Sequence, residues 1–177
     1  MLFTETKLRG AFLIALERRE DDRGYFARSF CQEEFAARGL DTRVAQCNVS
    51  FNRQKGTLRG MHFQAAPHAE AKLVRCTRGA IYDVILDLRR DSPTFKQHFA
   101  AELSVSNAAM LYVPEGFAHG FQTLAEDTEV FYQMSHSYHA ESARGVRWDD
   151  PAFGISWPAE AHRIVIDRDR NYPLFEE

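Results

Sequence analysis

A train of short segments separated by turn residues constrains the fold of this chain more than any other feature. Gly, Pro, Ser or Asn stands in most of the breaks, and the strongest breaks are at residues 78–79 and 92–94. The predicted strands are residues 43–52, 58–64, 71–77, 80–89, 95–104, 109–114, 117–124 and 128–137. Many short strands with such breaks predict an all-β fold, a double-sheet β-barrel of the jelly-roll type.

The N-terminal part of the chain adds further strands and one short helix. Residues 3–20 predict one or two strands, and a turn at residues 21–24 separates them from a strand at residues 25–30. A helix of about two turns is predicted after Ser29, because acidic residues stand early in it and Gly39 ends it. We therefore expect the helices to be short and peripheral.

The strand at residues 80–88 and the C-terminal tail both suggest how the barrel is covered. Apolar side chains fall on one face of the strand, and Asp83 and Asp87 fall on the other. From Gly145 onward the chain is rich in Trp, Pro and Gly, which is not typical of a long helix. We expect this tail to pack over the barrel.

The composition is that of a soluble globular protein with a single domain, residues 1–177. Hydrophobic residues make up 45% of the chain and the net charge is −3, so no basic surface for nucleic acid or acidic membrane is expected. Cys31, Cys47 and Cys76 are odd in number and form no C-x-x-C pair, which favours a reducing compartment. The apolar run at residues 11–16 is too short for a signal or membrane segment. We expect a cytoplasmic protein with no nucleic-acid or membrane partner.

Two glycine-punctuated strands each supply one histidine, His62 within residues 56–64 and His119 within residues 114–121. This pairing indicates the walls of a pocket and leaves three interpretations open: structural histidines, a metal site or acid–base chemistry. A metal is disfavoured, because Gln64 rather than a second histidine follows His62 at two residues, and no nearby acid completes a ligand set. We expect no metal here.

Three other side chains are candidates for the same pocket. Asp169 could hold the tautomer of a catalytic histidine, Tyr132 could donate a proton, and Lys72 could stabilise an oxyanion. Each also has an ordinary interpretation: a solvated charge for Asp169, packing for Tyr132 and a solvent-facing strand position for Lys72. Taken alone, these three residues do not decide between the catalytic and the ordinary interpretation.

Motifs spread over residues 22–169 resemble those of one enzyme family. They are Asp22-Arg23-Gly24-Tyr25-Phe26, Gln46-Cys47-Asn48-Val49-Ser50, Leu58-Arg59-Gly60-Met61-His62-Phe63-Gln64, Lys72-Leu73-Val74-Arg75-Cys76, Ser92-Pro93-Thr94-Phe95, Pro114-Glu115-Gly116-Phe117-Ala118-His119-Gly120-Phe121 and Trp148-Asp149-Asp150-Pro151. In this order they resemble the dTDP-4-dehydrorhamnose 3,5-epimerases of the nucleotide-sugar pathway to L-rhamnose. The resemblance implies a cupin-type jelly roll, a homodimer, and neither a metal nor an organic cofactor.

The resemblance also implies a role for each candidate residue. His62 matches the general base, Asp169 the carboxylate paired with it and Tyr132 the general acid. Lys72 is placed to steady the negative C4 oxygen of the substrate. The residues expected to contact the sugar or its nucleotide are Arg23, Phe26, Gln46, Asn48, Arg59, His119, Tyr138 and Arg168.

The implied reaction converts dTDP-4-dehydro-6-deoxy-D-glucose to dTDP-4-dehydro-L-rhamnose by epimerising C3 and C5. Both carbons lie beside the C4 carbonyl, so loss of either proton gives an enolate, and reprotonation from the other face inverts the carbon. Two enzymatic alternatives stay open: epimerisation of one carbon only, or another nucleotide such as CDP. A non-catalytic sugar-binding cupin is a third, which the retention of His62, Tyr132 and Asp169 disfavours.

Three positions depart from the family pattern. Arg28 and Ala143 stand where the family has glutamates, and Arg168 stands where it has a lysine. The resemblance places all three around the nucleotide, so their change in charge bears on which nucleotide or sugar is bound.

The spacing of Arg59 and His62 makes a structural prediction. Residues an odd number apart point to opposite faces of a regular strand. Both can serve one substrate only if Gly60 lets the strand bend or bulge. We therefore expect a local distortion at Gly60.

Overall fold

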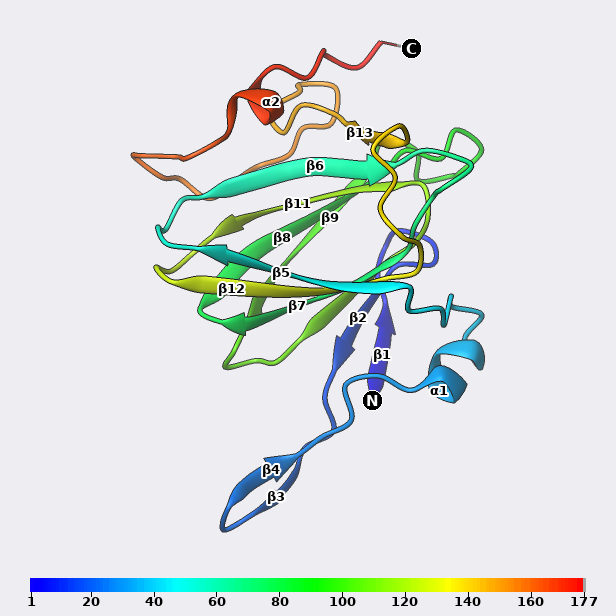
Figure 1. The fold of residues 1–177 in the computed structure, drawn as a ribbon, viewed down its shortest axis with the longest axis vertical. Helices are drawn as coiled ribbons and strands as arrows, with labels where there is room; N and C mark the ends of the chain where they lie inside the picture. The colour runs from blue at the N-terminus through cyan, green and yellow to red at the C-terminus, as the bar shows by residue number, and fades with distance from the viewer. Residues whose placement is uncertain (177) are drawn as a thin grey trace.

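Two antiparallel sheets face each other in the computed structural model, which describes residues 1–176 (Figure 1). In spatial order, the six-stranded sheet contains β1 (Leu2–Glu5), β2 (Phe12–Ala15), β10 (Met110–Val113), β7 (Lys72–Arg78), β12 (Thr128–Met134) and β5 (Gln46–Asn52). The five-stranded sheet contains β13 (Ala143–Gly145), β6 (Leu58–Gln64), β11 (Phe117–Thr123), β8 (Ala80–Asp87) and β9 (His98–Ser104). This architecture confirms the predicted all-β, double-sheet jelly roll.

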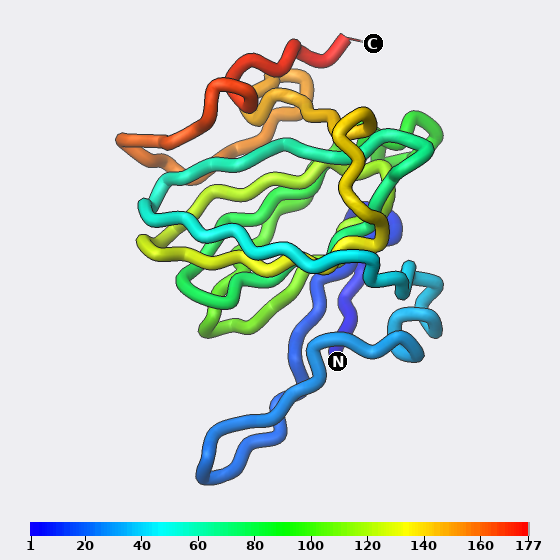
Figure 2. Tube along the Cα trace, in the orientation of Figure 1, coloured from blue at the N-terminus to red at the C-terminus, as the bar shows by residue number. Residues whose placement is uncertain are grey.

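The remaining elements lie outside the two sheets. The hairpin of β3 (Arg19–Asp21) and β4 (Gly24–Phe26) projects away from the barrel, as the blue part of the tube in Figure 2 shows. The two short helices are α1 (Gln32–Ala36) and α2 (Asp167–Arg170). Neither helix is long and apolar enough to cross a membrane.

Each of the eight strands predicted between residues 43 and 137 overlaps an observed strand, but several observed strands are shorter than predicted. The segment 95–104 begins its strand only at His98, because Phe95 and Gln97 donate their amides to turn carbonyls instead of to a neighbouring strand. The helix prediction was wrong about its start: the N-cap is Cys31, and no side chain caps α1. Gly39 follows the helix with φ +68°, the backbone conformation that favours glycine there.

Strand β8 is buried on both faces. Asp83 and Asp87 are fully buried, and their face joins Ile81 and Ile85 in the direction of the barrel interior. The alternation predicted two faces correctly, yet the acidic face is not the solvent face. Asp87 is satisfied internally, because it accepts hydrogen bonds from Arg89, Ser92 and Thr94. Burial alone raises the pKa of Asp87, but these bonds outweigh it and lower the pKa to about 2.

The other face of β8 lies beneath the C-terminal tail. Val84 and Leu86 pack in one cluster with Phe153 of the tail. Partly buried aromatic residues of the tail pack against that cluster, among them Trp148, Trp157 and Phe175. The expected packing of the tail over the barrel is confirmed, and it brings α2 up to β6 (Figure 1).

The predicted distortion at Gly60 is present. In the pairing of β6 with β11, His62 lies opposite His119 and Arg59 lies opposite Phe121, so β6 has one extra residue in this interval. Gly60 has φ +142°, and a Cβ atom added to it would lie 2.6 Å from Cα of Gly120. The bulge therefore requires glycine at this position. It also lets the side chains of Arg59 and His62 face the same cavity, although an odd number of residues separates them.

Replacement of Gly60 tests this requirement. Gly60→Ala should lower the free energy of unfolding by more than the strain of a rare backbone conformation, about 1–3 kcal/mol, because the new methyl group also meets backbone. Gly39→Ala is the matched control, since Gly39 also has positive φ but has open space around its Cα. Urea denaturation measures both variants, and equal losses would contradict a steric role for Gly60.

Candidate active site

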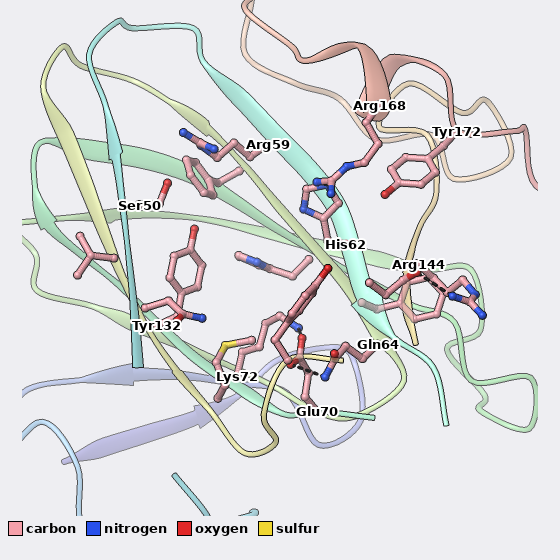
Figure 3. Close-up of a pocket in the computed structure, with 18 residues that line it drawn as sticks. Ser50, Arg59, His62, Gln64, Glu70, Lys72, Tyr132, Arg144, Arg168 and Tyr172 are labelled. Atoms are coloured by element: carbon pink, nitrogen blue, oxygen red, sulfur yellow. Dashed lines mark hydrogen bonds and ion pairs between the residues drawn. The ribbon is translucent and has the colours of Figure 1, made fainter. Parts of the chain in front are cut away.

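A cavity of about 330 Å³ opens between the two sheets, and side chains from both sheets and the tail line it (Figure 3). Eight residues predicted from the sequence are among its lining: Asn48, Arg59, His62, Lys72, His119, Tyr132, Tyr138 and Arg168. A ninth, Asp169, lies directly behind His62. The structure thus brings together most of the predicted site.

His62 is held by a buried carboxylate. Its Nε2 lies 2.8 Å from Oδ1 of Asp169, which is fully buried and also accepts the amide N–H of Gly60 at 3.1 Å. Burial raises the pKa of Asp169, but the hydrogen bonds from His62, Gly60 and Arg168 outweigh it, so the pKa lies below its ordinary value. An ionised carboxylate only accepts, so Nε2 carries the proton and Nδ1 keeps a lone pair. This arrangement suits a neutral histidine base.

Arg168 contacts both members of the His62–Asp169 pair. Its Nη2 lies 3.2 Å from Nε2 of His62, and its Nε donates to Asp169 at 3.2 Å. Since Nε2 already donates to Asp169, the first contact is an approach of two donors and not a second hydrogen bond. The positive guanidinium therefore lies against the His62–Asp169 pair.

Tyr132 projects from β12, on the sheet that faces His62 (Figure 3). Its ring lies 6.0 Å from that of His119 in an edge-to-face arrangement. Burial, with a further contribution from Asp83, raises the pKa of the Tyr132 phenol, while Arg59 opposes the shift. The hydroxyl is therefore protonated at neutral pH, as a proton donor has to be.

Lys72 lies in the cavity wall and not in solvent. It is buried, and its Nζ contacts Oε1 of Glu70, while Oε2 of Glu70 accepts a hydrogen bond from Gln64 at 3.0 Å. Burial lowers the pKa of Lys72, and the charge of Glu70 works against that shift. Glu70 was not predicted from the sequence. Its position two residues before a strand lysine, on the same face, was the available signal.

His119 has its own buried carboxylate. Its Nε2 lies 2.7 Å from Oδ1 of Asp83, and both residues are buried. The second oxygen of Asp83 has no hydrogen-bond partner within residues 1–176. Burial raises the pKa of Asp83, and the nearby His119 opposes the shift. Asp83 was missed because strand alternation placed it on the solvent side.

The two histidines do not form a metal site in this arrangement. His62 and His119 lie opposite each other on neighbouring strands, but Nε2 of each lies against its own carboxylate. Within the described residues, no third His, Cys, Asp or Glu completes a compact ligand set with them. Of the three interpretations, the geometry favours acid–base chemistry.

Two predicted substrate-binding residues lie outside the cavity of their own chain. Arg23 and Phe26 are carried away from the barrel by the β3–β4 hairpin, and 89% of the Arg23 side chain and 74% of Phe26 are exposed. Arg23 is paired with Asp21 in the hairpin turn. Within one chain the hairpin holds these two residues away from the cavity, so their role in substrate binding stays a prediction.

Gln46 does not line the cavity but contacts two residues that do. Its side chain accepts the amide N–H of Tyr138 at 2.8 Å and donates to Asn48 at 3.3 Å, so it positions two lining residues. Among the positions that depart from the family pattern, Ala143 and Arg168 line the cavity, whereas Arg28 pairs with Glu34 beside α1.

Further lining residues were not predicted. Tyr172 from the tail sits with its ring 6.2 Å from that of His62, and Arg144 adds a cation beside Ala143. Neither stands in a motif with a distinctive sequence, so only the packing of the tail and of β13 reveals them.

Comparisons with known proteins agree with this site. Residues 5–177 match the family model described as dTDP-4-dehydrorhamnose 3,5-epimerase. The chain is 44% identical over 173 residues to the dTDP-4-dehydrorhamnose 3,5-epimerase of Sinorhizobium fredii, covering 98% of this chain and 89% of that protein.

Solved structures give the same result. The dTDP-4-dehydrorhamnose 3,5-epimerase of Bacillus anthracis, with TDP and PPi bound, superimposes with a TM-score of 0.93 at 43% identity, covering 98% of this chain and 99% of that one. ChmJ of Streptomyces bikiniensis, a 3'-monoepimerase in complex with dTDP-quinovose, superimposes with a TM-score of 0.88 at 33% identity, covering 96% and 85%. The match to the family model over almost the whole chain, together with these full-length similarities, shows that the chain belongs to the dTDP-4-dehydrorhamnose 3,5-epimerase family.

Proposed function

We propose that this epimerase converts dTDP-4-dehydro-6-deoxy-D-glucose to dTDP-4-dehydro-L-rhamnose, with His62 as the base and Tyr132 as the acid. The observation that carries the proposal is the placement of the His62–Asp169 pair and the Tyr132 hydroxyl on facing walls of one cavity. Inversion at a carbon needs removal of a proton on one face and its return on the other, which these two walls supply.

The chemistry follows from the geometry of the groups. Nδ1 of His62 takes the proton from C3 or C5, and the electrons of the broken C–H bond move to the C4 oxygen as an enolate. The ring becomes an imidazolium, which the ionised Asp169 stabilises. Lys72 on the cavity wall supplies positive charge for the enolate oxygen. Tyr132 then protonates the carbon from the opposite side.

The mouth of the cavity suits the diphosphate of a nucleotide sugar. Arg59, Arg144 and Arg168 place three guanidinium groups in its lining, and guanidinium binds phosphate oxygens in a bidentate manner. Ala143 in place of the family's glutamate removes a negative charge from the same rim. Tyr138 offers a largely exposed ring on which a base can stack.

We further propose that the active form is a homodimer in which each hairpin serves the site of the other chain. Arg23 and Phe26 do not line the cavity of their own chain, and 74% of the apolar Phe26 is exposed when the chain is alone. Strand β5, next to the cavity, is a sheet edge with exposed Val49 and Phe51. Such an edge is available for a second copy.

A cytoplasmic location also belongs to this proposal. Cys31, Cys47 and Cys76 are free thiols, and two of them are at least partly accessible. Free accessible thiols are typical of a reducing compartment.

Deuterium exchange tests the assigned base. With dTDP-4-dehydro-6-deoxy-D-glucose in D2O, the protein should introduce deuterium at C3 and C5, and His62→Asn should introduce it at neither. The exposed His162→Asn is the control and should behave as the unaltered protein. Proton NMR follows both carbons. Exchange at one carbon would show a mono-epimerase, and exchange only with a CDP-linked sugar would show another nucleotide specificity.

Replacement of the assigned acid should separate two steps. Tyr132→Phe keeps the ring but removes the donor, so it should slow product formation by about 10²–10⁴-fold while proton removal by His62 continues. Product is measured by chromatography and exchange by NMR in the same reaction. Equal loss of both rates would contradict the role of Tyr132 as the acid.

Complementation tests the exchange of hairpins. Arg23→Ala and His62→Asn should each be impaired alone, but hybrids made by co-expression should regain activity, because one site then has an intact His62 and an intact Arg23 from the other chain. Differently tagged chains allow the hybrid to be isolated. If the hybrid is no more active than the impaired parents, or light scattering gives the mass of a monomer, the proposal is wrong.

A further inference from the structure

Three histidines and one glutamate lie close together outside the cavity lining: His68, His136, His139 and Glu141. One ring nitrogen each from His68 and His139 and one carboxylate oxygen of Glu141 all lie within 4.8 Å of one another. The ring of His136 lies 5.2 Å from each of the other two rings. In the part of the chain that the structure describes, no other group of potential metal ligands is this compact.

The ring nitrogens of His68 and His139 that face Glu141 are both Nδ1. Nδ1 of His139 lies 3.1 Å from Oε1 of Glu141, and Nδ1 of His68 lies 3.9 Å from the same oxygen. Nδ1 of His68 also lies 2.8 Å from Oγ of Ser142. A metal ion bound between these groups would replace the proton between His139 and Glu141, because a ligand has to offer a lone pair.

We propose that His68, His139 and Glu141 form a binding site for a divalent transition-metal ion, with Zn²⁺ as the best match. Two imidazoles and a carboxylate are a ligand set that zinc accepts, with a fourth position left for His136 or water. This site is distinct from the His62–His119 pair, so the proposal does not rest on the proposed reaction.

Binding requires one of the two stacked rings to turn, together with small shifts of the side chains. The rings of His68 and His139 are stacked, with centroids 3.6 Å apart and an angle of 4° between their planes. A metal ion lies in the plane of each imidazole that binds it, so one ring has to turn. His139 is free to do so, because it is partly exposed. Ligand atoms on tetrahedral zinc are about 3.4 Å apart, which asks each side chain to move by about 1 Å.

The ion would join two loops that already meet at the cavity. His68 lies in the β6–β7 loop, and His136, His139 and Glu141 lie in the segment between β12 and β13. Gln64 joins the same loops from the inside: it accepts the amide of His139 at 2.6 Å and donates to the carbonyl oxygens of His68 and Ser137. Tyr138, on the second loop, lines the cavity.

A metal at this position would therefore act as a clamp. It would connect the two loops at the outer surface, where 68% of the Glu141 side chain is exposed, as Gln64 connects them within. We expect bound Zn²⁺ to raise the midpoint of thermal unfolding, because it binds the folded arrangement and not the unfolded chain.

Direct titration tests the site. Full-length protein without a histidine tag is stripped with a chelator and titrated with ZnCl2 by isothermal calorimetry. We expect one ion per chain and, for His68→Ala and His139→Ala, binding weaker by about 10-fold or more, since even outer partners of a metal ligand contribute about 10–100-fold. Co²⁺ in place of Zn²⁺ should give the visible absorption of a low-symmetry site, lost in the same variants.

Two controls keep the test decisive. His162→Ala removes an exposed histidine away from the cluster and should bind zinc as the unaltered protein does. Glu141→Gln keeps the shape of an exposed side chain, so weaker binding by this variant cannot come from misfolding. Absence of binding below a Kd of about 1 mM in the unaltered protein overturns the proposal. Unchanged binding in His68→Ala, His139→Ala and Glu141→Gln would also overturn it.

Discussion

The contact of one buried carboxylate with a bulged strand is the interaction on which the rest of the site depends. Asp169 accepts the amide of Gly60 with one oxygen and the ring of His62 with the other. The amide belongs to the residue at which β6 leaves regular pairing, so without Asp169 this buried donor would lose its partner. The same carboxylate thus stabilises the distortion and fixes the tautomer of His62. Local backbone structure and chemistry cannot be separated here.

The polar interior of the barrel is built from pairs. His62 with Asp169, His119 with Asp83, and Lys72 with Glu70 each bring a carboxylate to a nitrogen base at the cavity. Burying charge is costly unless a partner is supplied, and such pairs are weak contributors to stability. Their value is that the donors are already oriented before a substrate arrives, so little reorganisation is needed as charge develops on it.

Much of this molecule could be predicted from its sequence, for identifiable physical reasons. Turn residues marked the ends of the strands. Arg59 and His62 are separated by an odd number of residues, so they could face one cavity only across a bulge, and the register of β6 and β11 contains that bulge. Alternation failed on β8, because the rule assumes that a polar face meets water, whereas here the tail covers one face and the barrel interior holds the acids.

Contacts between distant segments were the part that the sequence could not supply. Glu70 and Asp83 are unremarkable acids until folding places a lysine and a histidine beside them. Arg23 and Phe26 matched a substrate-binding motif, yet a motif does not say which chain's cavity a projecting hairpin reaches. The histidine cluster could not be predicted for the same reason. Its members, such as His68 and His139, lie in two loops that are about seventy residues apart in the sequence.

The two segments that border the cavity differ in how freely they can change. The tail supplies Asp169 and Tyr172, and its aromatic residues cover the five-stranded sheet. A substitution in the tail can therefore affect folding and the cavity together. Strand β13 and the segment before it supply Tyr138, Ala143 and Arg144 but add little to the hydrophobic core. Substitutions in this second segment can therefore change the lining of the cavity while the His62–Asp169 pair stays intact. Divergence of specificity within such a scaffold is expected to begin there.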